Sequence, residues 1–490
     1  MRRCGVLMPI SSIPSRFGIG GFSKEAYAFV DFLAEAGQSL WQILPLGPTG
    51  YGDSPYQSFS TFAGNPYYID LEALIQEGLL LEKECEEVDY GTNPNYVDYE
   101  KIYFSRFALL RKAFERADIQ NNAEFQAFVE KEKSWLKDYA MYMAIKDSLG
   151  GIAWIEWDED IRLRKPKAMK AYEEKLADDI AFYCYQQYLF FTQWHALKKY
   201  ANKKGVEIVG DIPIYVAFDG ADAWANPELF QLDEENIPVA VAGCPPDAFS
   251  ATGQLWGNPL YKWDYHKQTG YEWWVRRMAH CFDLYDVVRI DHFRGFDEYW
   301  AIPYGDETAE FGRWEKGPGY SLFEVLKKTL GNRPVIAEDL GFLTPSVIKL
   351  VKKTGYPGMK ILQFAFDPRE ESDYLPHNYT SNSVVYTGTH DNDTVNGWIE
   401  ALDKESLSFA KKYINVTRKK DICKTLIRVA LASVSETAII PIQDYLELGS
   451  EARINTPSTL GDNWKWRLSA DACTPELAKQ MAELASLYGR

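Results

Sequence analysis

Short apolar runs that end in polar residues recur along the chain, and stretches with helical periodicity separate many of them. The apolar runs predict eight buried strands, over residues 6–10, 40–46, 207–214, 287–292, 335–339, 361–366, 384–389 and 438–442. The helical stretches lie at residues 24–36, 321–330, 345–354 and 422–433. Because strands and helices alternate, the pattern favours an α/β fold in which eight strands form a closed parallel barrel rather than an open sheet.

Two stretches interrupt this alternation. Residues 70–205 are rich in helix formers, charge and aromatic side chains, which predicts a mainly helical insertion after the second strand. Residues 242–259 are rich in Gly, Pro and Asp and predict an irregular active-site loop, since loops this long in a compact enzyme are usually functional. We therefore expect one catalytic barrel over residues 1–490 that carries both features.

The strand predicted at 287–292 ends in a burst of charge, in the run Val-Val-Arg-Ile-Asp-His-Phe-Arg over residues 287–294. Arg289 and Asp291 are two residues apart, so strand alternation places both on one face. A guanidinium beside a carboxylate keeps it ionised and oriented, as a nucleophile or a metal ligand requires. A structural ion pair at the strand end is the alternative that this run alone leaves open.

Other acids stand at the ends of predicted strands. Glu338 follows the strand at 335–339, Asp391 follows the strand at 384–389, and Asp211 lies in the strand at 207–214. In a barrel these carboxyl ends converge on one rim. Each acid alone could be a helix cap or an ion-pair partner. Several together cost free energy unless they perform chemistry or bind a cation.

A metal site is poorly supported. The chain has six His residues, and no pair has the spacing of a zinc protease. Asp391-Asn392-Asp393 resembles the start of a calcium loop, but Asn396 and Leu402 occupy its glycine and bidentate-glutamate positions. Glycoside chemistry needs two carboxylates and no metal. We expect no metal and no cofactor.

Composition narrows the classes of ligand that the protein could bind. Aromatic residues make up 15% of the chain, with 15 Trp and 31 Tyr, and the net charge is −17. This charge opposes binding to nucleic acid or to an anionic membrane. Aromatic faces stack on sugars, although most of these side chains are expected to fill the core. A sugar is therefore the better candidate for the ligand.

The location is expected to be cytoplasmic. Seven Cys without a C-x-x-C pair fit reduced intracellular thiols rather than a disulfide framework. The N-terminal apolar stretch is short and is broken by Pro9, unlike a signal peptide. No run of 18 apolar residues predicts a membrane span.

Several further motifs occur in order along nearly the whole chain. They are Ile-Pro-Ser-Arg-Phe-Gly-Ile-Gly at 13–20, Leu-Pro-Leu-Gly-Pro-Thr-Gly-Tyr-Gly-Asp-Ser-Pro-Tyr-Gln at 44–57, Gly-Asn-Pro-Tyr at 64–67, Gly-Asp-Ile-Pro-Ile-Tyr at 210–215, Gly-Gln-Leu-Trp-Gly-Asn-Pro at 253–259, Arg-Ile-Asn-Thr-Pro at 453–457 and Asn-Trp at 463–464. Together with the acid motifs, this set resembles the 4-α-glucanotransferase family (amylomaltase, or disproportionating enzyme) of the α-amylase superfamily. Ordinary α-amylases usually show Asn-His shortly after the Asp that matches Asp211; this chain does not.

The resemblance implies a (β/α)8 TIM barrel with helical insertions, and an enzyme that transfers α-1,4-glucan segments with retention. Its donor would be an α-1,4-glucan and its acceptor a sugar hydroxyl. By motif match, Asp291 would be the nucleophile, Glu338 the general acid/base and Asp391 the stabiliser of the transition state. Retention requires the first two carboxyls to be roughly 5 Å apart.

The resemblance also implies a set of substrate contacts. They are Tyr56, Asp211, Gln254, Trp256, Arg289, His292, Asp367, His390 and Asn463. Tyr51 would belong to a separate glucan groove. The loop at 242–259, with Trp256 and Tyr56, is expected to hold the acceptor over the intermediate and to exclude water.

Two other functions stay open. An α-amylase-like hydrolase would use the same fold and acids with water as the acceptor. A non-catalytic glucan-binding protein would need only the aromatic surfaces, and the intact acid triplet argues against it.

Overall fold

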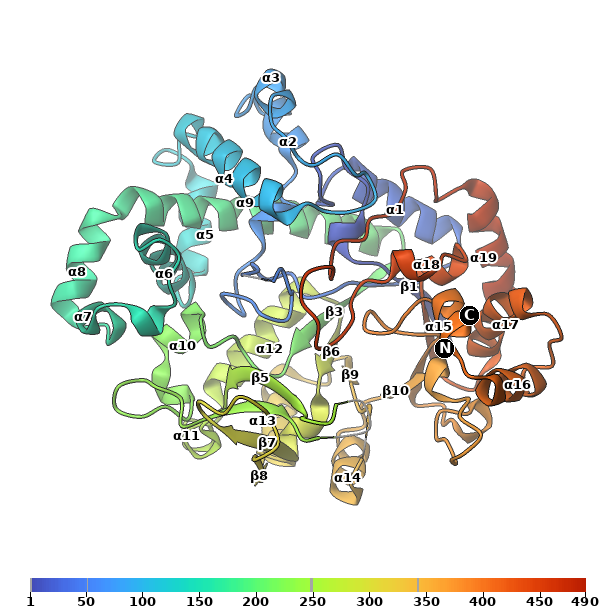
Figure 1. The fold of residues 1–490 in the computed structure, drawn as a ribbon. Coiled ribbons are helices and arrows are strands. Elements are labelled where there is room, and N and C mark those ends of the chain that lie inside the picture. The colour runs from blue at the N-terminus through green and yellow to red at the C-terminus, as the bar shows by residue number, and fades with distance from the viewer. Residues whose placement is uncertain (1, 51, 247–249, 342) are drawn as a thin grey trace.

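The computed structural model describes residues 2–50, 52–246, 250–341 and 343–490. Eight parallel strands form its centre: β1 (Arg3–Leu7), β2 (Leu40–Gln42), β3 (Glu207–Pro213), β6 (Val287–Asp291), β9 (Val335–Ala337), β10 (Gly358–Ile361), β11 (Ser383–Tyr386) and β12 (Thr437–Pro441). Their order is β10-β11-β12-β1-β2-β3-β6-β9. The Ala337 amide donates to the Pro357 carbonyl at 3.0 Å and links the two ends of this order. The predicted (β/α)8 barrel is confirmed (Figure 1).

Helices surround the strands. They include α1 (Lys24–Glu35), α12 (Glu272–Leu284), α13 (Tyr320–Leu330), α14 (Pro345–Thr354), α15 (Val395–Ala401), α16 (Lys404–Tyr413), α17 (Ile422–Ala432) and α19 (Pro475–Leu487). Helix α14 shows how the sequence sets their ends. The Thr344 hydroxyl caps its first turn, Pro345 occupies its first position, and Gly355 ends it with φ of 77°.

The sixth strand differs from its prediction. It spans residues 358–361 instead of 361–366, and residues 362–364 form a 3-10 turn, η6 (Leu362–Phe364). The Asp339 carboxylate accepts from the Met359 amide at 2.7 Å and holds the chain at the earlier position. Apart from Phe364, the residues of the run at 361–366 are buried although the strand ends at 361, and periodicity alone does not distinguish a buried strand from a buried turn.

In the described part of the stretch between β2 and β3, eight α-helices occur: α2 (Leu71–Gln76), α3 (Glu82–Glu86), α4 (Tyr99–Arg116), α5 (Ala123–Lys131), α6 (Leu136–Ser148), α7 (Glu159–Arg162), α8 (Pro166–Lys175) and α9 (Ala177–Lys203). They gather on one side of the barrel (Figure 1). Aromatic side chains join them, as where Phe114 packs against Phe182 and Tyr185. Many of the aromatic residues are therefore core.

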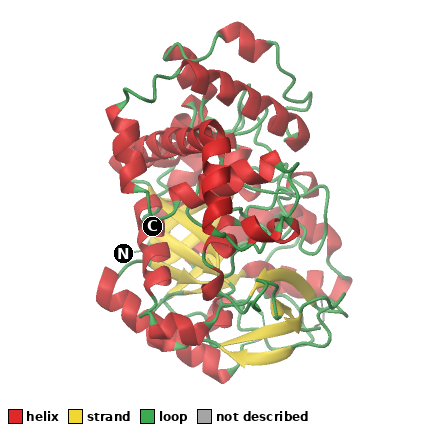
Figure 2. Cartoon of the chain, turned by 90° about the vertical axis from the view of Figure 1, so that its left-hand side faces the viewer, coloured by secondary structure: helices red, strands yellow, loops and turns green. Residues whose placement is uncertain are grey.

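A second sheet stands beside the barrel (Figure 2). It is antiparallel, with the order β5-β4-β7-β8, and its strands are β4 (Ala240–Cys244), β5 (Gln254–Pro259), β7 (Glu298–Pro303) and β8 (Arg313–Lys316). The stretch at 242–259 is therefore not irregular throughout, because residues 242–244 belong to β4 and residues 254–259 to β5, which together make up half of it. Gly253 and Gly257, both with positive φ, interrupt the alternation that would have predicted strands.

The remaining α-helices of the described residues are short: α10 (Ala221–Ala225), α11 (Trp263–Gln268) and α18 (Ile442–Tyr445). Among the residues that the structure describes, no helix is both long and apolar enough to span a membrane.

Candidate active site

A cavity of about 470 Å³ opens where the barrel strands end at their carboxyl termini. Seven residues predicted for the site line it: Tyr56, Gln254, Trp256, Asp291, His292, His390 and Asp391. They come from β5, β6 and the loops after β2, β6 and β11. The fold therefore gathers at one rim residues that are hundreds of positions apart in sequence.

Arg289 joins two carboxylates inside the barrel. Asp211 on β3 and Arg289 on β6 are paired in register, and Arg289 Nη1 donates to both Asp211 oxygens at 2.7 and 2.6 Å. Its Nη2 donates to Asp291 Oδ1 at 2.9 Å. Asp211 is 0% exposed and Arg289 2%. The structural ion pair and the predicted catalytic position are thus parts of one network.

Two opposing effects act on the charge of Asp291. Burial raises its pKa above the usual value for Asp, and the positive charge of Arg289 acts in the opposite direction. The nearby carboxylates of Asp211 and Asp391 add to the rise. Arg289 therefore limits an increase that burial alone would make larger.

Glu338 follows β9 directly and is held by backbone amides. Its Oε2 accepts from the His292 amide and its Oε1 from the Leu340 amide, each at 2.7 Å. Burial, and then the charge of Asp291, raise the pKa of Glu338 to about 8. The carboxyl is therefore protonated near neutral pH. A neutral carboxyl beside one that Arg289 helps to ionise is the usual arrangement of an acid and a nucleophile.

Strand register sets the spacing of this pair. Ile290 and Ala337 face each other across the β6–β9 ladder, so Asp291 and Glu338 are the next positions on neighbouring strands. Neighbouring strands lie about 4.8 Å apart. This is close to the roughly 5 Å that separates the two carboxyls of a retaining glycosidase.

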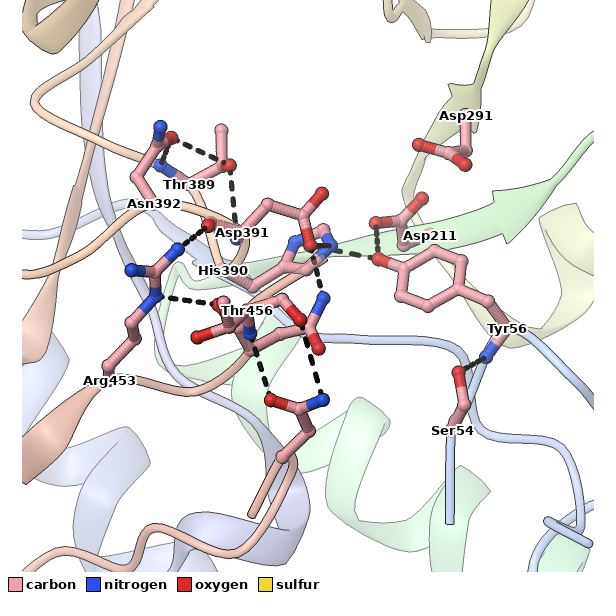
Figure 3. Close-up of polar contacts among 12 residues, drawn as sticks. Ser54, Tyr56, Asp211, Asp291, Thr389, His390, Asp391, Asn392, Arg453 and Thr456 are labelled. Atoms are coloured by element: carbon pink, nitrogen blue, oxygen red, sulfur yellow. Dashed lines mark hydrogen bonds and ion pairs between the residues drawn. The ribbon is translucent and has the colours of Figure 1, made fainter. Parts of the chain in front are cut away.

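Tyr56 and His390 form one wall of the cavity. Their rings stack with centroids 5.1 Å apart and planes 18° apart. The Tyr56 hydroxyl donates to Asp211 Oδ2 at 2.7 Å (Figure 3). Burial, and then the charge of Asp211, raise the pKa of Tyr56 well above 10, which preserves the hydroxyl as a donor.

Trp256 and His292 form another part of the wall. Their rings pack edge to face, with centroids 4.8 Å apart and an angle of 87° between the ring planes. Trp256 Nε1 donates to Gln254 Oε1 at 3.1 Å. His292 has φ of 53°, a left-handed conformation that a residue other than Gly seldom adopts. Burial, and then Arg294, lower the pKa of His292 to about 3, so its ring is neutral.

Asp391 lies on the loop between β11 and α15. Its Oδ1 accepts from Asn455 Nδ2 at 2.7 Å and lies 3.3 Å from His390 Nε2. Its side chain is 43% exposed. A partly exposed, oriented carboxylate beside the cavity suits contact with sugar hydroxyls.

The cavity does not account for three residues that were predicted to contact the glucan: Asp367, Asn463 and Tyr51. Asp367 forms an ion pair with Arg369 at 2.7 Å, and Asn463 bonds Thr456 and Thr459 at 2.9 Å. Neither is among the described residues that line the cavity, and both stay predictions. Tyr51 lies outside the described residues.

Sequence reasoning missed three residues that hold the Asp391 loop: Asp444, Arg453 and Asn455. Arg453 Nη2 donates to the Asp391 carbonyl at 2.8 Å (Figure 3). Arg453 and Asn455 belong to the motif at 453–457, which gave no role for either residue. The position of Asp444 could have indicated a role, because it is a carboxylate three residues after β12, and the other acids near strand ends were predicted as site residues.

The comparisons with known proteins agree with this geometry. The model of the 4-alpha-glucanotransferase family matches residues 8–473. A 4-alpha-glucanotransferase from Clostridium butyricum is 50% identical over 99% of this chain and all of its own length. Another, from Streptococcus pneumoniae, is 51% identical over all of this chain and 97% of its own.

A solved structure gives the same result. The amylomaltase from Streptococcus agalactiae, in complex with acarbose, superposes with a TM-score of 0.97 at 43% identity, and the match covers all of both chains. This chain therefore belongs to the 4-alpha-glucanotransferase family.

Proposed function

We propose that this enzyme transfers α-1,4-glucan segments from a donor to the 4-hydroxyl of an acceptor glucose or maltooligosaccharide, with retention of configuration. One observation carries the proposal: Asp291 and Glu338 are neighbours on adjacent strands, one paired with Arg289 and the other protonated near neutral pH. Family membership supports the same activity.

In the first step, Asp291 attacks the anomeric carbon of the donor while Glu338 gives its proton to the glycosidic oxygen. The bond between that carbon and the glycosidic oxygen breaks, and the leaving glucan departs with a free 4-hydroxyl. The donor residue stays on Asp291 as a β-linked ester. Arg289 orients Asp291 for this attack, since it donates to Oδ1 at 2.9 Å.

In the second step, Glu338 is an anion and takes the proton of the acceptor 4-hydroxyl. The acceptor oxygen attacks the anomeric carbon, and the ester bond to Asp291 breaks. Two inversions restore the α configuration. In both steps Asp391 binds hydroxyls of the sugar ring and stabilises the positive charge that develops on it.

Transfer requires that an acceptor sugar reach the ester more often than water does. Trp256 and Tyr56 offer aromatic faces on two sides of the cavity, and both rings are fixed by neighbours. Stacking on these faces holds an acceptor near the ester and displaces water. Arg289, Asp211, His292 and His390 form the surroundings of the donor sugar.

Incubation with maltotriose tests the proposal against hydrolysis and simple binding. Transfer yields free glucose and a ladder of longer oligomers without a net gain in reducing ends. Hydrolysis would yield shorter products only, with a gain in reducing ends, and a binding protein would leave maltotriose unchanged. The Asp291→Asn variant is the matched control, because a contaminating glucosidase would stay active in that preparation.

A further inference from the structure

The loop that carries Asp391 is held by a different part of the chain. Residues 442–463, which follow β12, reach it at several points. Asp444 is buried and accepts from Thr387 Oγ1 at 2.5 Å and from the Val395 amide at 2.8 Å, on either side of Asp391. Together with Arg453, which donates to the Asp391 carbonyl, it fixes the backbone of the loop.

Asn455 is the member of this segment that meets the Asp391 side chain. Its Nδ2 donates to Asp391 Oδ1 at 2.7 Å. Its own backbone is fixed from two sides, since its amide donates to the His390 carbonyl at 3.1 Å and its carbonyl accepts from Arg453 Nε at 2.8 Å. Because a carboxylate only accepts, the amide nitrogen must face it.

We propose that Asn455 is a positioning residue for catalysis: its amide orients the Asp391 carboxylate toward the donor sugar. Asn455 Nδ2 and His390 Nε2 both lie near Oδ1, so the carboxylate is oriented from one side and Oδ2 meets the sugar hydroxyls. The proposal rests on the role given to Asp391 under the proposed function. It adds a residue that acts through Asp391.

The alternative roles of Asn455 predict different kinetics. A direct contact with the sugar would contribute to substrate binding, so its loss would raise KM. A purely structural link would affect stability whatever charge the side chain carries. An orienting donor acts in the transition state, so its loss lowers kcat.

Asn455→Asp separates these roles, because it keeps the shape of the side chain. At low pH the introduced carboxyl is protonated and its O–H replaces the amide donor. As pH rises, the carboxyl ionises, the donor is lost and a second negative charge faces Asp391. The charged and titratable groups that share this part of the cavity are Tyr56, Asp291, His390, Asp391 and Arg453.

The experiment measures kcat and KM for maltotriose between pH 5 and 8 in the wild type, Asn455→Ala, Asn455→Asp and Asn396→Ala. Asn396 is the matched control, because its amide also links the two segments, through the Glu447 carbonyl at 2.7 Å, without reaching Asp391. We expect Asn455→Ala to lower kcat roughly 10- to 100-fold, the scale of a lost hydrogen bond to a charged group. Asn396→Ala should stay within about twofold.

The ratio of kcat in Asn455→Asp to that in the wild type should fall at least about tenfold as pH rises. A ratio that is constant with pH, a kcat of Asn455→Ala near that of the wild type, or a rise in KM alone would overturn the inference. An equal loss in Asn396→Ala would do the same. Asp391→Asn tests the role on which this inference rests: if it stays active, the role given to Asp391 fails and this inference fails with it. If it is inactive while Asn455→Ala keeps the kcat of the wild type, only this inference fails. The proposed function itself fails if the wild type forms no ladder of oligomers from maltotriose.

Discussion

The two halves of the catalytic rim are built in different ways. The strand-borne half, Asp211, Arg289, Asp291 and Glu338, lies on or directly after adjacent strands, and the ladder sets its spacing. The loop-borne half, which is Tyr56, His390 and Asp391 on loops together with Trp256 on β5 of the second sheet, is placed by ring stacking and by hydrogen bonds from distant segments. Backbone hydrogen bonds thus position the proposed nucleophile and acid, and side-chain contacts position the residues that we propose to contact the sugar.

This difference predicts where substitutions act. Changes in the strand-borne half should remove chemistry or stability, because Asp211 and Arg289 are buried and the charges of the four residues act on one another. Changes in the aromatic wall of the loop-borne half, Trp256 and Tyr56, should leave cleavage of the donor intact. They should alter whether a sugar or water reacts with the glucosyl ester.

The largest effect is expected for Asp291→Asn. An amide is too weak a nucleophile to form the glucosyl ester, so kcat for maltotriose disproportionation should fall about 10⁴-fold or more. Thermal unfolding should confirm that the variant is folded. A variant that keeps more than a tenth of the activity would remove Asp291 from the nucleophile position.

The largest effect on stability is expected for Arg289→Met. It leaves the buried carboxylate of Asp211 and the partly exposed carboxylate of Asp291 without their cation, which should lower the free energy of unfolding by about 3–5 kcal/mol. Urea unfolding measures the loss. Arg418→Met is the control, because Arg418 pairs with Asp421 on the surface and such pairs contribute little. Equal midpoints for Arg289→Met and the wild type would show that the pair does not stabilise the barrel.

A smaller effect is expected from pH. As the proposed general acid, Glu338 can act only while it is protonated, and its pKa is raised to about 8. The value of kcat/KM should therefore hold up to about pH 8 and fall about tenfold per unit above it. In Glu338→Gln the rate should be low and the alkaline limb absent. If kcat/KM of this variant still falls above about pH 8, a group other than Glu338 causes the fall.

The smallest effect is expected in the aromatic wall. Trp256→Ala removes one stacking face for the acceptor, which is worth about 0.5–1.5 kcal/mol, so the ratio of transfer to hydrolysis should fall roughly 2- to 10-fold. Total cleavage of the donor should change less. Product analysis by chromatography measures both quantities. An unchanged ratio would show that Trp256 only anchors its strand.

The barrel could be predicted because its strands are buried apolar runs that end in polar residues. The second sheet could not, since Gly253 precedes β5 and Gly257 interrupts its alternation, and since β4 pairs with β7, which follows more than 50 residues later. The sixth strand was misplaced because most of residues 361–366 are buried although the strand ends at 361. Apolar character reports burial more directly than it reports the end of a strand.

The contacts of the site also differ in whether the sequence could predict them. The spacing of Arg289 and Asp291 predicted their contact, because both lie on one strand. The bond from Arg289 to Asp211 depends on the register between β3 and β6, which no local pattern encodes. The contact of Asn455 with Asp391 crosses 64 residues between two loops, and only the folded chain reveals it.

The central claim is that Asp291 carries the glucosyl intermediate, and trapping tests it most directly. Glu338→Gln with α-glucosyl fluoride should accumulate the intermediate, because fluoride leaves without an acid while the next step lacks its base. Peptide mass analysis should then find one glucosyl group on the peptide that contains Asp291. A glucosyl group on any other residue, or an inverted product without a labelled peptide, would contradict the account.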